Sequence, residues 1–331
     1  MKSDLNKTSI FLALIICLLS CKEITNFYTK EFKLSYARPI GLMMSHEFDS
    51  LDLSGAGVRI GVIDAGFGNF KTNEFTKNLN VVAYRDFISN DTSGFFSAKE
   101  SEHGTIVTKS IGGKNENQVH GLAYNAEYFL AKTDIEDSEP IADEIRLIKA
   151  IDWLVKQNVS LINISLGYTI FDDDKSYSNK DLNGKIALSS KYIDSLLNSN
   201  KHIMIVVSAG NEGDKDWKYL TFPSDVKEVI TVGSTDFDGL TGYPSSGKGV
   251  DYVDYVKPEV STYASPIGNS NTAPVITGLI ASLLQIQNLD RAFVKKIISE
   301  SASNYETPDR EMGYGVPNTK KILEKMKTYR Q

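Results

Sequence analysis

Short apolar runs rich in β-branched residues alternate along the chain with longer stretches of helical periodicity. The runs that we interpret as strands are residues 58–63, 81–84, 128–131, 161–164, 203–207 and 229–232. The stretches that we interpret as helices are residues 105–111, 141–157, 186–198, 272–286, 291–299 and 319–326. This alternation predicts an α/β fold, a doubly wound, mainly parallel sheet with helices on both faces. A functional site is then expected at the carboxyl ends of the strands.

The first apolar run, residues 10–19, differs from the others because Lys2 and Lys7 precede it. A positive segment followed by an apolar run of this length is typical of a secretory signal peptide. The run is short for a membrane-spanning helix. It ends in the sequence Leu-Leu-Ser-Cys, which closes at Cys21 and resembles the lipobox of bacterial lipoproteins. An uncleaved apolar anchor is the alternative.

This pattern predicts three parts of the chain. Residues 1–20 are expected to be a signal peptide, residues 21–38 a lipidated N-terminus and tether, and residues 39–331 the folded domain. Cys21 is the expected lipidation site, so the protein would be anchored in the bacterial cell envelope. Lys22 follows the cysteine and favours the outer membrane, with the domain facing the periplasm or the exterior.

Composition narrows the classes of function. The formal net charge is -6 and no cluster of Lys or Arg stands out, which argues against a nucleic-acid partner. The chain has 2 cysteines, Cys17 and Cys21, both near the N-terminus, so packing or bound ions must stabilise the fold. The polar segment 169–183 is rich in Asp and predicts a surface loop, with a structural calcium site as the alternative. The oligomeric state stays open.

Two residues that suit proton transfer lie at expected element ends. Asp64 ends the first predicted strand, and Gly66 and Gly68 permit a tight exit from it. His103 opens a predicted helix in the sequence Glu-His-Gly-Thr. Taken alone, each has an ordinary structural interpretation, because Asp is common in turns and a histidine can simply pack.

Two further residues suit the stabilisation of negative charge. Asn211 lies between glycines after another predicted strand, where its amide could donate to a developing oxyanion. Ser270 lies at the start of a helix whose first turn contains Pro274. Free N–H groups and the helix dipole favour negative charge there. An ordinary Asn-Gly turn and a serine N-cap are the alternatives.

Together the four segments contain a carboxylate, a base, an oxyanion donor and a nucleophile, in the order Asp, His, Asn, Ser. Residues 58–66, 103–105, 208–213 and 268–274 resemble the corresponding motifs of the subtilase family of serine peptidases. The resemblance extends from about residue 36 to about residue 323. It implies a subtilisin-like fold and a serine endopeptidase that acts on proteins or peptides. No cofactor is required for that chemistry.

The resemblance also implies a role for each residue. Ser270 would attack the peptide carbonyl, His103 would transfer the proton, and Asp64 would orient the histidine. Asn211 and the Ser270 N–H would bind the oxyanion, with Asn269 adding a side-chain donor. The residues implied in substrate binding are Ser165, Leu166, Gly167, Ala209, Gly210, Glu212 and Thr221. Thr221 would lie at the floor of the pocket and Glu212 at its rim, which predicts cleavage after medium-sized or basic residues.

Three residues depart from the family pattern. Asn269 replaces the usual Thr, Asn271 replaces the usual Met, and Tyr168 stands where a small Gly is common and is expected to narrow the cleft. These departures leave open a catalytically impaired subtilase fold that acts as a peptide-binding module. A nucleotide-binding α/β protein is a third class, but residues 65–68 lack the third spaced glycine that its phosphate loop needs.

Overall fold

The computed structural model describes residues 35–45, 48, 51–135, 138–173 and 177–329. The predicted signal peptide, Cys21 and most of the predicted tether lie outside these residues. The chain divides into two compact units. In the small unit, the described residues are Ser35 and 116–118, and the Ser35 N–H donates to the Asn117 carbonyl across 2.9 Å. The large unit, residues 36–115 and 119–331, contains the main sheet.

Seven strands of the described chain form one sheet in the order β3-β5-β2-β6-β7-β8-β9, and every neighbouring pair is parallel. Their bounds are β2 (Arg59–Asp64), β3 (Asn80–Asp86), β5 (Glu127–Lys132), β6 (Leu161–Ile164), β7 (Met204–Ser208), β8 (Ile230–Ser234) and β9 (Val260–Thr262). Two short strands are β1 (Ser35–Tyr36) and β4 (Gln118–Val119). The chain runs to one side of β2 through β3 and β5, then to the other side from β6 onward. This reversal between β2 and β6 is where doubly wound sheets form a crevice.

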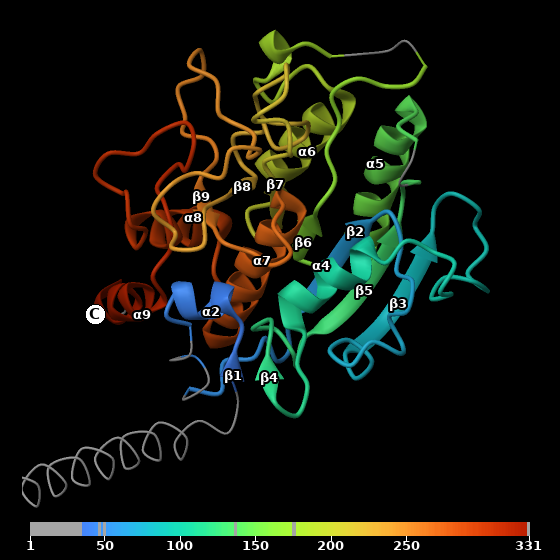
Figure 1. Ribbon diagram of the computed structural model, residues 1–331, viewed down its shortest axis with the longest axis horizontal. Helices are drawn as coiled ribbons and strands as arrows, with labels where there is room; N and C mark the ends of the chain where they lie inside the picture. The colour runs from blue at the N-terminus through green and yellow to red at the C-terminus, as the bar shows by residue number, and fades with distance from the viewer. Residues whose placement is uncertain (1–34, 46–47, 49–50, 136–137, 174–176, 330–331) are drawn as a thin grey trace, which may run out of the picture. The chain divides into compact units, whose positions relative to one another are not determined.

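The helices of the described residues surround this sheet (Figure 1). Their bounds are α2 (Arg38–Leu42), α4 (His103–Gly112), α5 (Ile141–Lys156), α6 (Leu188–Ser199), α7 (Asn269–Ile286), α8 (Arg291–Glu300) and α9 (Thr319–Tyr329), with a short 3₁₀ helix η1 (Asn179–Asp181). The six predicted strands and six predicted helices are therefore confirmed within a few residues at each end. The sequence analysis missed α2, which has only 5 residues, and β9, which has only 3.

Side-chain alternation along the strands shows that helices cover both faces of the sheet. Gly61 on β2 faces α5, because a Cβ there would lie 2.6 Å from the Leu154 side chain. Its neighbour in register on β6 is Ile162, so the next residue, Asn163, faces the opposite side. Asn163 Oδ1 accepts from Thr277 Oγ1 of α7 across 2.9 Å. The predicted arrangement of helices on both faces is confirmed.

Two contacts hold the helices in place on these faces. On one face, α5 and α6 share a buried apolar cluster with the strands, to which Leu154 and Ile193 contribute. On the other, α7 packs very close to α4 at Gly278, where a Cβ would lie 2.5 Å from the Ile111 carbonyl oxygen. Both α4 and α7 begin near the carboxyl ends of the strands, so this packing fixes their first turns relative to each other.

Among the described residues, no single helix is long and apolar enough to cross a membrane. Only the pair α7 and α8 reaches that length and composition together, and the two helices are bent by 117° at the break between them. In the same part of the chain, no group of three or more His, Cys, Asp or Glu side chains is placed to hold a metal ion. The acidic segment 169–183 includes residues 174–176, which lie outside the described residues.

Candidate active site

Asp64 and His103 form a hydrogen-bonded pair at the carboxyl edge of the sheet. His103 Nδ1 lies 2.7 Å from Asp64 Oδ1, and the same oxygen accepts the Ala65 N–H across 2.8 Å. Asp64 is the last residue of β2 and its side chain is fully buried, whereas the His103 side chain is 29% exposed at the start of α4. The Gly104 N–H donates to the Gly66 carbonyl across 2.8 Å, which joins the two segments beside the pair.

This pair determines the tautomer of the histidine. An ionised carboxylate can only accept hydrogen bonds, so Nδ1 carries the proton that it donates to Asp64. Nε2 of the neutral ring then has a lone pair and can take a proton. The buried negative charge of Asp64 also stabilises the ring after it is protonated. The pair can therefore act as a general base of fixed orientation.

Ser270 lies in the first turn of α7, which begins at Asn269. N–H groups in a first turn have no acceptor within the helix, and the helix dipole favours negative charge there. Gly268, just before the helix, has a φ of 152°, which side chains rarely adopt. The Ser270 carbonyl accepts from Ser165 Oγ across 2.7 Å, which ties α7 to the segment after β6. The partly exposed Ser270 is thus held where an attack by its hydroxyl would create an oxyanion at the N-terminus of the helix.

Asn211 follows β7, and its side chain is tied to the start of α7. Asn211 Oδ1 accepts the Asn269 main-chain N–H across 3.0 Å and Asn269 Nδ2 across 3.3 Å. Asn269 Nδ2 also donates to the Gly210 carbonyl, and Asn269 Oδ1 accepts from Ser234 Oγ across 2.6 Å. Asn211 is exposed, whereas Asn269 is completely buried. The amide nitrogen of Asn211 therefore faces away from Asn269, as an oxyanion donor would require.

The segments implied in substrate binding, residues 165–167 and 209–210, follow the neighbouring strands β6 and β7. Thr221 lies between them. A Cβ at Gly210 would lie 2.6 Å from Thr221 Oγ1, and a Cβ at Gly167 would overlap the same oxygen. Thr221 is 4% exposed, and its hydroxyl has no hydrogen-bond partner among the described residues. Its side chain therefore fills the space between the two segments.

Two other residues near the site have different surroundings. Glu212 Oε1 pairs with Lys215 Nζ across 2.9 Å, so its charge at the predicted rim is partly compensated. Asn271 is 6% exposed, and its Oδ1 has no hydrogen-bond partner within the described part of the chain.

Tyr168 packs in the core, so the expectation that it narrows the cleft is wrong. Its side chain is 2% exposed and belongs to the apolar cluster under α5 and α6. Its hydroxyl donates to Asp134 Oδ1 across 3.0 Å. Burial, with a smaller contribution from the nearby Asp64 charge, raises the pKa of Asp134 to about 6, while hydrogen bonds from Thr133 and Tyr168 oppose the shift. A second buried carboxyl group therefore lies close to Asp64.

The sequence analysis missed three polar residues that hold this site together. Asn163 Nδ2 donates to Ser165 Oγ across 2.9 Å, while Ser234 and Ser246 both donate to Asn269 Oδ1, across 2.6 Å and 3.2 Å. A polar residue within the apolar run Leu-Ile-Asn-Ile was a signal for Asn163. No comparable signal marked the two serines, because their partner is distant in the sequence.

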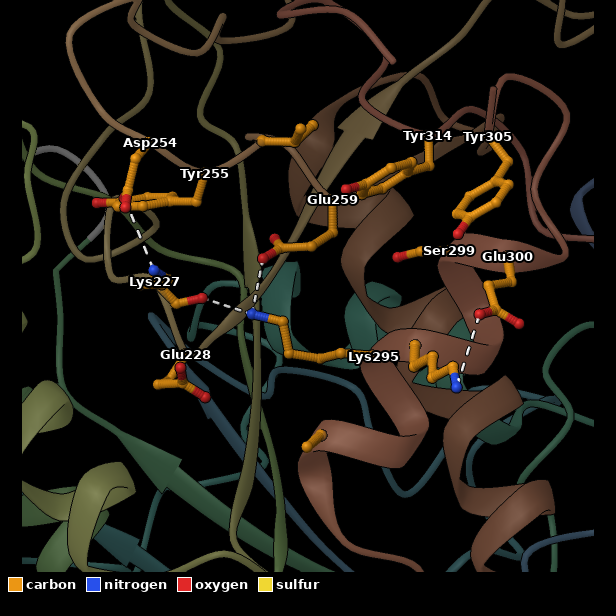
Figure 2. Close-up of a pocket in the computed structure, with 13 residues that line it drawn as sticks. Lys227, Glu228, Asp254, Tyr255, Glu259, Lys295, Ser299, Glu300, Tyr305 and Tyr314 are labelled. Carbon is orange, nitrogen blue, oxygen red and sulfur yellow. Dashed lines mark hydrogen bonds and ion pairs between the residues drawn. The ribbon is translucent and has the colours of Figure 1, made fainter. Parts of the chain in front are cut away.

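A separate cavity of about 500 Å³ lies beside α8 (Figure 2). Lysines, acids and tyrosines line it, and the charged groups pair with one another: Lys295 Nζ lies 2.9 Å from Glu259 Oε1, and Lys227 Nζ lies 3.6 Å from Asp254 Oδ1. Lys227 and Glu259 precede or begin strands β8 and β9, so the cavity lies at the amino ends of these strands. It is therefore distinct from the candidate site, which lies at the carboxyl ends.

Comparison with known proteins agrees with the fold. The model of the Subtilase family matches residues 55–315. The chain is 28% identical over 244 residues to an intracellular serine protease of Paenibacillus polymyxa, covering 71% of this chain and 68% of that protein. It is 25% identical over 265 residues to subtilisin E of Bacillus subtilis (strain 168), covering 77% of this chain and 62% of that protein. Among solved structures, the Clostridium perfringens CspB protease has a TM-score of 0.73 at 16% identity, covering 88% of this chain and 98% of that chain. That likeness confirms the predicted subtilisin-like fold class.

Proposed function

The chain belongs to the subtilase family, and on that premise we propose that it is a serine endopeptidase that hydrolyses peptide bonds through an acyl-enzyme. The observation that carries the proposal is the 2.7 Å hydrogen bond between the buried Asp64 and His103, together with the position of Ser270 in the first turn of α7. The similarity of the chain to an intracellular serine protease and to subtilisin E supports the same class of reaction.

The proposed mechanism assigns one role to each group. Ser270 Oγ attacks the carbonyl carbon, and His103 Nε2 takes the hydroxyl proton as the new C–O bond forms. The oxyanion accepts hydrogen bonds from the Ser270 N–H and from Asn211 Nδ2. The protonated His103 then gives its proton to the leaving amine, and water hydrolyses the acyl-enzyme by the same steps. Every proton and electron pair moves among protein, substrate and water, so the chemistry needs no cofactor.

Proteins or peptides in extended conformation are the proposed substrates. Residues 165–167 follow the carboxyl end of β6, and we propose that a strand of substrate pairs with their main chain. Ser165 Oγ is engaged with the Ser270 carbonyl, so this segment is held in register with the nucleophile. Thr221 would limit the depth of the pocket for the residue before the cut.

A fluorophosphonate probe tests the proposal directly, because it reacts only with an activated serine. The purified protein should be labelled at Ser270, and Ser270→Ala should lose both the label and the hydrolysis of a denatured protein substrate. Ser199→Ala, on the exposed end of α6, is the matched control and should keep both. Absence of labelling and hydrolysis in the unaltered protein would instead favour a catalytically impaired, peptide-binding module.

We further propose that residues 1–20 direct export and that Cys21 is lipidated, which would anchor the peptidase domain, residues 39–331, to the bacterial cell envelope through the tether. The support is the sequence Leu-Leu-Ser-Cys at the end of an apolar run that follows two lysines. Lys22 favours the outer membrane as the site of the anchor. Acylation there would keep the peptidase outside the cytoplasm and near exported substrates.

A further inference from the structure

The Asn269 side chain is held in one orientation by hydrogen bonds on both of its ends. Ser234 Oγ and Ser246 Oγ donate to Asn269 Oδ1, across 2.6 Å and 3.2 Å. On the other end, Asn269 Nδ2 donates to the Gly210 carbonyl and to Asn211 Oδ1. A carbonyl oxygen can only accept, so the amide nitrogen must face Gly210. The side chain is completely buried, so water does not compete for these bonds.

This arrangement leaves Asn269 no N–H to offer to substrate. A side-chain amide has two N–H bonds, and the two acceptors Gly210 and Asn211 use both of them. Direct donation from Asn269 to an oxyanion, as the family resemblance implied, would require one of these bonds to break. That would leave a buried acceptor unpaired, which costs about 1–3 kcal/mol.

Asn211 is the residue that benefits from this arrangement. It is exposed, and the terminal torsion of an asparagine is broad and roughly two-fold, so the amide could present either its nitrogen or its oxygen to the crevice. Two donors from Asn269, the main-chain N–H at 3.0 Å and Nδ2 at 3.3 Å, converge on Asn211 Oδ1. With its oxygen held there, the nitrogen must face the other way.

We propose that Asn269 is a positioning residue that acts through Asn211: it holds Asn211 Oδ1 so that Asn211 Nδ2 faces the oxyanion formed on attack by Ser270. The inference rests on the proposed serine peptidase activity. A rotated Asn211 would present an acceptor to the oxyanion, and the two negative ends would repel each other. Asn269 therefore contributes to turnover without touching substrate.

A double-mutant cycle on turnover tests this inference. The full-length protein, Asn211→Ala, Asn269→Ala and the double variant are assayed on one soluble peptide substrate, with probe labelling and melting temperature measured for each. Asn211→Ala should lower kcat by about 10²–10³-fold. Asn269→Ala should lower kcat by about 10-fold or more with little change in KM, because misplacement of a catalytic group is costly.

The decisive comparison is the effect of Asn269→Ala in the absence of Asn211. If Asn269 acts through Asn211, adding Asn269→Ala to Asn211→Ala should change kcat by less than about twofold. An equal loss of kcat in both backgrounds would overturn the inference and favour direct donation by Asn269. An equal loss that tracks the melting temperature would also overturn it, in favour of a merely structural role.

Two more variants keep the test decisive. If Asn269→Ala fails to fold, Asn269→Thr replaces it in the double-mutant cycle. The threonine hydroxyl keeps one donor, so this variant should retain part of the kcat. Asn198→Ala is the matched control, because it makes the same substitution at an exposed position of α6, where the amide donates to Asp194. It should keep kcat within about twofold. An unaltered protein without hydrolysis or labelling would overturn the proposed function itself, whereas an active protein with independent effects overturns only the role of Asn269.

Discussion

The Ser165 hydroxyl donates to the main-chain carbonyl of Ser270 across 2.7 Å, so a residue just after β6 holds the first turn of α7. The same hydroxyl accepts from Asn163 Nδ2 across 2.9 Å, and Asn163 Oδ1 accepts from Thr277 Oγ1 in the next turns of the helix. This chain of hydrogen bonds fastens the nucleophile-bearing helix to the sheet. It links a segment expected to bind substrate with the residue expected to attack it.

Ser165→Ala should therefore affect stability and turnover together. It leaves the Ser270 carbonyl and Asn163 Nδ2 without their partner, and an unsatisfied buried polar group costs about 1–3 kcal/mol. We expect a lower melting temperature and a kcat reduced by about 10-fold, since a small displacement of Ser270 lengthens its approach to the substrate. Thermal unfolding and steady-state kinetics measure both effects. Full activity at an unchanged melting temperature would contradict this role.

Asp64→Asn should lower turnover much more than it lowers stability. The asparagine can occupy the same buried space, but its amide would no longer fix the tautomer in which His103 Nδ1 donates. A loss in kcat of about 10⁴-fold is expected from such a change. Fluorophosphonate labelling of Ser270 should slow in parallel. Asp238→Asn, at an exposed position, is the control and should behave like the unaltered protein.

Thr221→Gly should widen the range of residues accepted before the cut. The Thr221 side chain fills the space between Gly167 and Gly210, so its removal deepens the pocket that those segments would form. We expect a shift in a peptide-library profile from medium-sized residues toward large aromatic ones. Thr221→Ser keeps the hydroxyl and should change the profile little. Identical profiles for all three proteins would show that another residue forms the floor.

The stability of the protein should depend on pH through Asp225. Burial raises the pKa of Asp225 to about 6 from its ordinary value of 3.8, while hydrogen bonds from Ser190 and Gly184 and the charge of Lys257 oppose the shift. A raised pKa means that the folded state holds the proton more tightly. The stabilising contribution is therefore present below about pH 3.8 and lost as the pH rises through about 6.

Asp225→Asn cannot ionise, so its melting temperature should rise relative to that of the unaltered protein between pH 4 and about pH 7. The variant should be less stable than the unaltered protein, because its amide cannot accept hydrogen bonds from both Gly184 and Ser190. The difference in melting temperature between the two proteins should become smaller as the pH rises. Asp251→Asn, at a fully solvated position, should give a curve parallel to the unaltered protein. Parallel curves for Asp225→Asn as well would refute the assignment.

Cys21→Ala should abolish lipid incorporation. The expected result is loss of a metabolically incorporated fatty acid and release of the protein from the membrane fraction, because the acylated sulfur is gone. Cys17→Ala is the matched control, since Cys17 lies within the predicted signal peptide and should be removed with it. Unchanged partition of the Cys21 variant into detergent would favour an uncleaved anchor.

The hydrophobic pattern by itself determined the fold class and most of its elements. Continuous β-branched runs such as residues 161–164 are buried on both faces of a parallel sheet, so burial leaves a direct signature in the sequence. The positions of Asp64 and His103 at element ends were also readable, because strand and helix boundaries have local signals. Short elements such as β9 escaped because 3 residues carry too little pattern.

Only the tertiary structure decided how polar side chains pair across the fold. Asn269 is 35 residues from Ser234 and 58 from Asn211, and nothing local shows that its amide is used up in holding Asn211. The sequence likewise predicted that Tyr168 narrows the cleft, but its ring packs in the apolar cluster under α5 and α6. Such contacts depend on the direction in which each side chain leaves a packed backbone. That direction is set by the arrangement of the whole sheet and its helices, which a local sequence pattern does not contain.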